Sequence, residues 1–537
     1  MPTLKRKKKI LIIGLDGASW DVFDDSLLKT CMPNLGRLKD TGAWSVLRST
    51  EPPITPVAWT TCLTGCEPRT HGVIGMLEYS CREDALKIVT SGRCSVPNLW
   101  QLLSEQGYSV VSLNVPWTYP CKAVNGLLVA GFGSPGPKAQ ITYPPGFKDE
   151  LLARIPDYEI QGNWNKLREY PMEKLNENLK GAERSFEQRV ESAKLACEKV
   201  DWDVMMVHFQ DTDTLSHRIW PFIDSKTRDF YPVERDRILT TFAKLDGAIG
   251  QLLEMAEKGS MIFVISDHGL CRKTLKVRPN VLLRMWGYLK PEGLFVRAAK
   301  QLAKNLGADR LKKKRGPRQP DQCGFEWSQS KAMMVTMALN GHVFLNVKGR
   351  QPNGIVEPGA EYEKLLGELK ARLAAVVEPR TGEPVFSRVA TATEVYGVSA
   401  QEQTKYGDLI IVPAKGVEFS MSPSGKNEAI VPSDDNELVG VHSYEGICII
   451  CGEGVKPGQN QPADIVDIAP TLMAASGAKL PKHMDGRVLK KIFHEEIEVE
   501  YQDSDLLKHK QSDESGTLAD EEKDEITKRL SALGYIE

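Results

Sequence analysis

The stretch KILIIGLDG, residues 9–17, sets the expected fold. It is a short run of branched apolar side chains that ends at a carboxylate, Asp16. Similar runs lie in DVMMVHFQDTD (203–213), SMIFVISDHG (260–269) and GICIICG (446–452). Helical patterns such as DRILTTFAKLDGAIGQLLEMAEKG (236–259) lie between them. Apolar runs that alternate with helices predict an α/β fold, in which helices cover both faces of a mainly parallel sheet.

Length and composition describe a globular protein with more than one domain. The chain has 537 residues, of which 41% are hydrophobic and 26% are charged. A net charge of -2 argues against specific nucleic-acid binding or a general affinity for membranes. We expect no transmembrane segment, because the apolar runs are too short to span a bilayer. Eleven cysteines without a regular spacing indicate reduced thiols and a cytoplasmic location.

The composition and the predicted secondary structure of the chain change between His268 and His442. Residues 276–330 look helical and basic, and residues 331–415 mix strands with the helical pattern EYEKLLGELKARLAAVV. We expect residues 1–275 and 430–495 to form the main domain and residues 276–429 to form an inserted α+β cap. Residues 496–537 indicate a polar linker followed by a C-terminal helix.

Candidate metal ligands stand where the apolar runs end. Asp213 and His217 are four residues apart, so a helix that follows the strand would place both on one face. The alternative is a capping aspartate and a surface histidine. Asp267 and His268 directly follow another run, and a simple turn is the alternative there. Asp16 could equally cap a helix, and His442 could be a solvated loop residue.

These positions carry more weight as a set. In parallel sheets, function gathers at the carboxyl ends of the strands. Three of the nine histidines (His217, His268 and His442) lie beside such ends, together with three aspartates. This set is large enough for two divalent metal ions, with zinc favoured and manganese as the alternative. Two metal ions suit phosphoryl transfer, and the hydroxyl-rich stretch PPITPVAWTTCLTGCEPRTHG (52–72) offers nucleophiles.

In their order, the motifs GLDG, TPVAWTTCLTGCEPRTHG, DTDTLSH, SDHG and GVHSYEG resemble those of the alkaline phosphatase superfamily. Within it, the chain is similar to the type I phosphodiesterase/nucleotide pyrophosphatase family, in its cytoplasmic branch of predicted phosphohydrolases and phosphomutases. The resemblance covers residues 8–275 and 430–495. It implies an alkaline-phosphatase-like three-layer α/β/α sandwich with an inserted cap.

The resemblance also implies roles for individual residues. The family nucleophile lies ten residues before the glycine of a TG pair, and counting back from Gly65 gives Thr55. Attack by Thr55 would form a phosphothreonine that water then hydrolyses. One metal would be held by Asp16, Thr55, Asp267 and His268, and the second by Asp213, His217 and His442. Asp211 is a weaker candidate in DTD, because its spacing to His217 fits the family pattern less well.

One position departs from the family pattern. Nucleotide pyrophosphatases have an asparagine three residues after the nucleophile, where it holds a phosphate oxygen, and Ala58 stands there in this chain. Asn114, the cap and backbone amides are the candidates that could replace this contact. The departure leaves nucleotide specificity open.

The predicted function is a phosphohydrolase that uses two metal ions and cleaves phosphodiester or pyrophosphate-type bonds. Its partner would be a phosphorylated small molecule, with nucleotides among the candidates. A first alternative is a phosphomutase on the same core, which resembles a phosphoglycerate mutase and needs a closed cap. A second alternative is a non-catalytic metal-binding scaffold, which is disfavoured because all seven expected metal-site positions are filled.

Overall fold

The computed structural model describes residues 8–83, 85–162, 172–224, 226–293, 325–336, 339–422, 428–433, 440–503 and 518–533. The chain divides into two compact units. The first unit comprises residues 1–73, 90–272 and 438–518, and the second comprises residues 74–89, 273–437 and 519–537. Much of the predicted basic segment at 276–330 and of the polar linker lies outside the described residues.

A ten-stranded sheet forms the centre of the first unit. Its middle strands are parallel and lie in the order β9 (Met261–Ile265), β1 (Ile10–Leu15), β8 (Val204–Phe209), β5 (Val110–Val115) and β6 (Gly126–Ala130). The flanking strands include β7 (Thr142–Tyr143), β19 (Glu445–Cys451), β2 (Ala43–Arg48), β20 (Gly458–Gln459) and β21 (Ala463–Asp464). Among these, β7, β19 and β2 each run antiparallel to the inner neighbour, so β2 has the same direction as the middle strands. The predicted mainly parallel sheet is confirmed.

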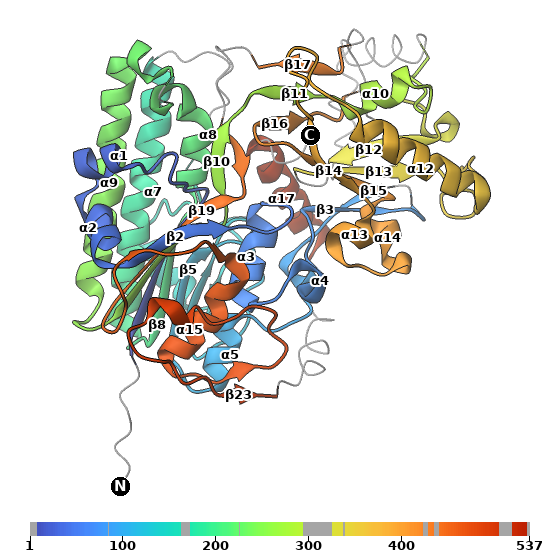
Figure 1. Cartoon of the computed structure of the whole chain (residues 1–537). Helices are drawn as coiled ribbons and strands as arrows, with labels where there is room; N and C mark the ends of the chain where they lie inside the picture. Colours follow the sequence, from blue (N-terminus) through green and yellow to red (C-terminus); the bar gives the residue numbers. More distant parts are fainter. Residues whose placement is uncertain are drawn as a thin grey trace. The chain divides into compact units, whose positions relative to one another are not determined.

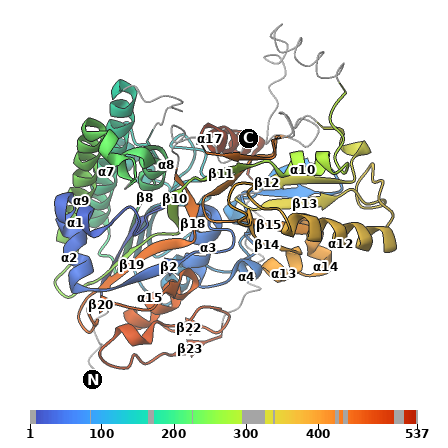
Figure 2. The same cartoon turned by 45° about the horizontal axis from the view of Figure 1, so that its top comes forward.

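Helices cover both faces of this sheet (Figure 1, Figure 2). One layer contains α1 (Asp25–Cys31), α2 (Pro33–Thr41), α7 (Met172–Lys199), α8 (Asp211–Ile223) and α9 (Pro232–Met255), which pack on one another. The other layer contains α3 (Thr55–Thr64), α5 (Leu99–Glu105) and α15 (Ile468–Ser476). The expected α/β/α sandwich is therefore confirmed. None of the described helices has the length and apolar character that crossing a lipid bilayer requires.

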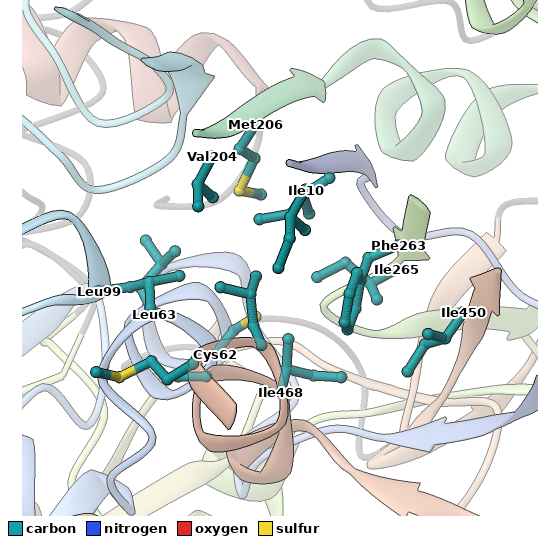
Figure 3. Packing of buried hydrophobic residues seen from close by; sticks show 14 of the residues in the cluster. Ile10, Cys62, Leu63, Leu99, Val204, Met206, Phe263, Ile265, Ile450 and Ile468 are labelled. Atoms are coloured by element: carbon teal, nitrogen blue, oxygen red, sulfur yellow. The ribbon is translucent and has the colours of Figure 1, made fainter. Parts of the chain in front are cut away.

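The middle strands are buried on both faces, which explains their continuous apolar sequence. All six residues of β1 are buried. Its Ile10 and Ile12 belong to a buried cluster that also contains Phe263 of β9 and helix residues such as Leu63 and Ile468. Figure 3 shows this packing, with side chains of the sheet facing those of α3, α5 and α15. The tight core fixes the strands, and with them the positions of the residues that follow each strand.

The second unit is a separate α+β structure. Its largest sheet is antiparallel, in the order β12 (Ala332–Thr336), β13 (Gly341–Leu345), β15 (Leu409–Pro413) and β14 (Phe386–Ala390). Helices α10 (Pro279–Met285) and α12 (Ala360–Ala374) pack on this sheet. A smaller sheet has the order β16 (Val417–Phe419), β11 (Leu275–Val277) and β17 (Ile430–Pro432). Helices α13 (Ala392–Tyr396), α14 (Ala400–Tyr406) and α17 (Asp520–Leu533) complete the unit.

One segment differs from the expected domain boundaries. The hairpin of β3 (Leu77–Ser80) and β4 (Ala85–Ile88) belongs to the second unit, although the sequence analysis placed it in the main domain. The Tyr79 ring lies 4.6 Å from that of Phe344, measured between centroids. The thiol of Cys81 donates to the carbonyl of Thr404 over 3.0 Å. Contacts with residues far away in the sequence therefore decide which unit the hairpin belongs to.

Replacing Phe263 by alanine should lower the free energy of unfolding by about 3–5 kcal/mol, because its fully buried ring fills the core. Phe230→Ala is the matched control, since that ring is 76% exposed, and it should change stability by less than about 0.5 kcal/mol. Denaturant unfolding followed by circular dichroism measures both. Equal losses in the two variants would contradict the described core.

Candidate active site

Two adjacent strand ends form the first group of ionisable side chains. Asp16 follows β1, and Asp267 and His268 follow β9, its parallel neighbour. One ligand atom from each residue lies within 4.8 Å of those from the other two, and all three residues are buried. The Gly17 amide donates to Oδ1 of Asp267 over 3.1 Å and thereby links the two strand ends. Parallel strands that end at one edge bring these residues together.

The second group contains Asp213, His217 and His442, whose ligand atoms also lie within 4.8 Å of one another. Helix α8 starts at Asp211, so the predicted helical spacing of Asp213 and His217 is confirmed. Nε2 of His217 lies 3.2 Å from Oδ1 of Asp213. His442 arrives on β18 (Gly440–Ser443), which pairs with β10 (Gly269–Arg272). Because β10 directly follows His268, this pairing places the second group beside the first.

Backbone carbonyls orient the imidazoles of the second group. Nδ1 of His217 donates to the carbonyl of Gly440 over 2.5 Å, and Nδ1 of His442 donates to that of Pro53 over 2.9 Å. The two Nε2 atoms then face each other at 2.9 Å. With the proton on Nδ1, each Nε2 carries a lone pair. When both Nε2 atoms are deprotonated, they are close enough to bind one cation together.

The close packing of buried carboxylates shifts their pKa values. Burial and the nearby Asp213 raise the pKa of Asp16 well above its usual value, and burial and Asp16 raise the pKa of Asp267 in the same way. Burial also acts to raise the pKa of Asp213, but the surrounding histidines, His217 first, outweigh it and lower that pKa. Buried carboxylates this close are stabilised by a bound cation.

The donor set fits divalent cations. Oδ2 of Asp267 is buried, and among the described residues no hydrogen-bond donor reaches it. The rings of His268 and His442 stack with their centroids 3.8 Å apart, so the two groups adjoin. Carboxylate oxygens and imidazole nitrogens are ligands that zinc and manganese accept. The geometry therefore supports metal binding at the joined strand ends.

Thr55 lies at the first group, where α3 begins. Its side chain is fully buried, with Oγ1 3.4 Å from Oδ1 of Asp16 and 3.5 Å from Nε2 of His268. The amino end of a helix favours negative charge beside it. By contrast, the Thr60 and Thr64 hydroxyls donate to carbonyls one turn earlier in α3. Thr55 is thus the α3 hydroxyl that the structure places against candidate metal ligands.

Three other positions named from the sequence have different surroundings. Oδ1 of Asp211 accepts from the amide of Gly162 over 2.9 Å, and Asp211 belongs to neither group. Asn114 has a left-handed φ of 61°, and its side-chain amide donates to the His208 carbonyl over 3.4 Å. Ala58 is buried in the hydrophobic core beneath α3. Position 58 therefore contributes apolar packing rather than a polar side chain.

His208 and Trp59 also contact Asp16, and the sequence analysis gave neither a role. Nε1 of Trp59 lies 2.9 Å and Nε2 of His208 lies 3.0 Å from Oδ2 of Asp16. Burial first, and then the Arg189 cation, lower the pKa of His208 well below its usual value, which favours a neutral imidazole. The signal in the sequence was a single histidine within the apolar run VMMVHF.

Two comparisons find known proteins that resemble this chain. A family model described as type I phosphodiesterase/nucleotide pyrophosphatase matches residues 10–445, a range that includes both groups and Thr55. The search of curated proteins finds no match. Among solved structures, the phosphonoacetate hydrolase of Sinorhizobium meliloti 1021, in complex with phosphonoformate, is similar with a TM-score of 0.54 and 16% identity. That alignment covers 88% of this chain and 96% of the other.

At this level of identity the structural likeness shows the fold alone. The family match spans most of the chain and confirms the resemblance seen in the motifs. The chain therefore belongs to the type I phosphodiesterase/nucleotide pyrophosphatase family and is a phosphoric ester hydrolase.

Proposed function

We propose that this enzyme hydrolyses phosphodiester or pyrophosphate-type bonds through a phosphothreonine formed on Thr55. The observation that supports this most is the position of the Thr55 hydroxyl, 3.4 Å from Asp16 and 3.5 Å from His268. A nucleophile needs such activation, because a free threonine hydroxyl is a weak nucleophile at neutral pH.

In this proposal each group holds one divalent cation, with zinc favoured and manganese as the alternative. The first ligand set is Asp16, Thr55, Asp267 and His268, and the second is Asp213, His217 and His442. When bound, the cations would lower the pKa of the threonine hydroxyl and neutralise charge on the transferred phosphoryl group.

The chain's own residues then carry out two displacements. Oγ1 of Thr55 gives up its proton and forms a bond to phosphorus while the bond from phosphorus to the leaving oxygen breaks. The leaving oxygen takes that electron pair, and a proton from solvent neutralises it. Water next attacks the phosphothreonine: its oxygen forms a bond to phosphorus, the bond from phosphorus to Oγ1 breaks, and a water proton goes to Oγ1. The amino end of α3 stabilises the negative charge that builds up beside Thr55 in both steps.

The substrate in this proposal is a phosphorylated small molecule, with nucleotides among the candidates. Ala58 has no side-chain amide to offer a phosphate oxygen, so another group must make that contact, and Asn114 stays a prediction for the role. A cytoplasmic location and a cap formed by residues 276–429 also stay predictions from the sequence.

Gly17→Ala should lower kcat/KM by about 100-fold, the effect of displacing a reacting group by about 1 Å. A Cβ at Gly17 would lie 2.7 Å from Oδ1 of Asp213, and its φ of +65° disfavours a side chain. Gly107→Ala is the matched control, because Gly107 has a φ of +77° but open space around it. Hydrolysis of bis-p-nitrophenyl phosphate measures both. A Gly17→Ala enzyme as active as Gly107→Ala would contradict the described geometry.

Thr55→Ala should lower kcat/KM by at least about 1,000-fold, because it removes the attacking oxygen. Thr55→Ser keeps a hydroxyl and should retain measurable activity. Thr60→Ala changes the same helix at a hydroxyl bonded to the Pro56 carbonyl, so it should act like the unmodified enzyme. Bis-p-nitrophenyl phosphate, p-nitrophenyl phosphate and nucleotides are the substrates to compare.

Acid-quenched turnover mixtures add a direct readout by peptide mass spectrometry. We expect a phosphoryl adduct on the Thr55 peptide of the active enzyme and none in Thr55→Ala. Full activity in Thr55→Ala would refute the proposed nucleophile.

A further inference from the structure

We infer that Trp59 and His208 are positioning residues that hold Asp16 by one carboxylate oxygen and reserve the other for a metal ion. The inference rests on the proposed role of Asp16 as a metal ligand. It goes further because it assigns a function to two buried side chains outside the ligand sets.

The two oxygens of Asp16 have different surroundings. Oδ2 accepts hydrogen bonds from Nε1 of Trp59 over 2.9 Å and from Nε2 of His208 over 3.0 Å. Oδ1 lies 3.4 Å from Oγ1 of Thr55 and 3.8 Å from Nε2 of His268. An indole N–H can only donate a hydrogen bond, so Trp59 must be the donor and the carboxylate the acceptor. Two donors on Oδ2 leave Oδ1 as the oxygen that faces the metal group.

Three elements of the fold hold the two donors. Trp59 lies on α3 and His208 on β8, and both side chains are fully buried. Their rings meet edge to face, with centroids 4.9 Å apart and an interplanar angle of 89°. Gly14 of β1 pairs with His208 in the sheet register. A Cβ on Gly14 would lie 2.9 Å from the His208 ring and 3.1 Å from the Trp59 ring, so glycine leaves the room that both rings occupy.

This arrangement predicts how Asp16 binds a metal ion. A carboxylate with one oxygen occupied by two donors binds through the other, in a monodentate manner. Removal of a donor lets the carboxylate rotate, so that its ligand oxygen is less well placed. Partners of metal ligands typically contribute 10- to 100-fold to metal affinity. Trp59 and His208 should therefore matter for metal binding itself, besides any effect on turnover.

Zn²⁺ affinity tests the inference, measured on metal-stripped full-length protein by competition with a chelating dye. Trp59→Phe removes the donor and keeps most of the ring, and it should weaken one Zn²⁺ site by about 10- to 100-fold. Trp100→Phe is the matched control, because Trp100 is fully buried in the same cluster. Among the described residues its Nε1 has no hydrogen-bond partner. Trp100→Phe should bind Zn²⁺ as the unmodified protein does.

His208 provides a second pair of variants. His208→Phe removes the donor and should weaken the same site, whereas His208→Gln keeps an N–H donor and should recover part of the affinity. Asp16→Asn serves as the reference that identifies this site, and thermal unfolding shows which variants remain folded. If His208→Phe does not fold, Trp59→Phe alone settles the outcome.

Two results would overturn the inference. Only one of them would also refute the proposed function. Normal Zn²⁺ affinity in Trp59→Phe and His208→Phe, with a site lost in Asp16→Asn, would refute the positioning role and leave the proposed function intact. Normal affinity in Asp16→Asn as well would refute Asp16 as a ligand, and the proposed function would then fail together with the inference.

Discussion

Mutual repulsion among three buried carboxylates is the constraint on which this site depends. Asp16, Asp213 and Asp267 are fully buried. Besides burial, Asp213 raises the pKa of Asp16, and Asp16 and Asp213 raise the pKa of Asp267. Water cannot screen charges at such depth, so their cost must be offset by nearby donors and cations. The histidines, the Trp59 indole and the backbone N–H groups stabilise the negative charge. The donor set also fits divalent cations, which would neutralise it.

The fold meets the requirement through a rigid support. The strands that carry the site are buried on both faces, and helices on each side pack their apolar residues against them. Rotation of a strand would expose core residues, so the side chains just beyond each strand end have little freedom. Gly14 and Gly17 then allow close approach where a Cβ would collide with the site. The packed core thus fixes the positions of the charged groups at the edge of the sheet.

Much of this arrangement could be predicted from the sequence, for physical reasons. Apolar runs such as those of β1 and β9 indicate strands buried on both faces, and the residues after them must share an edge. The structure brings together the same aspartates and histidines that the motifs single out. Their roles as metal ligands, and that of Thr55 as nucleophile, stay predictions.

Other features depend on contacts between distant residues, which one sequence does not reveal. The apolar run of β19 gives no sign that this strand lies antiparallel to β9. The hairpin at 74–89 joins the second unit through Phe344 and Thr404. His208 lies within a strand. Its contact with Asp16 cannot be predicted without knowing that β1 lies next to β8.

Anomalous diffraction from crystals grown with Zn²⁺ or Mn²⁺ would locate the metal ions bound at this site. The account predicts two anomalous peaks about 3.5–4 Å apart. One would lie among Asp16, Thr55, Asp267 and His268, and the other among Asp213, His217 and His442. A single peak, or peaks away from these side chains, would contradict the account.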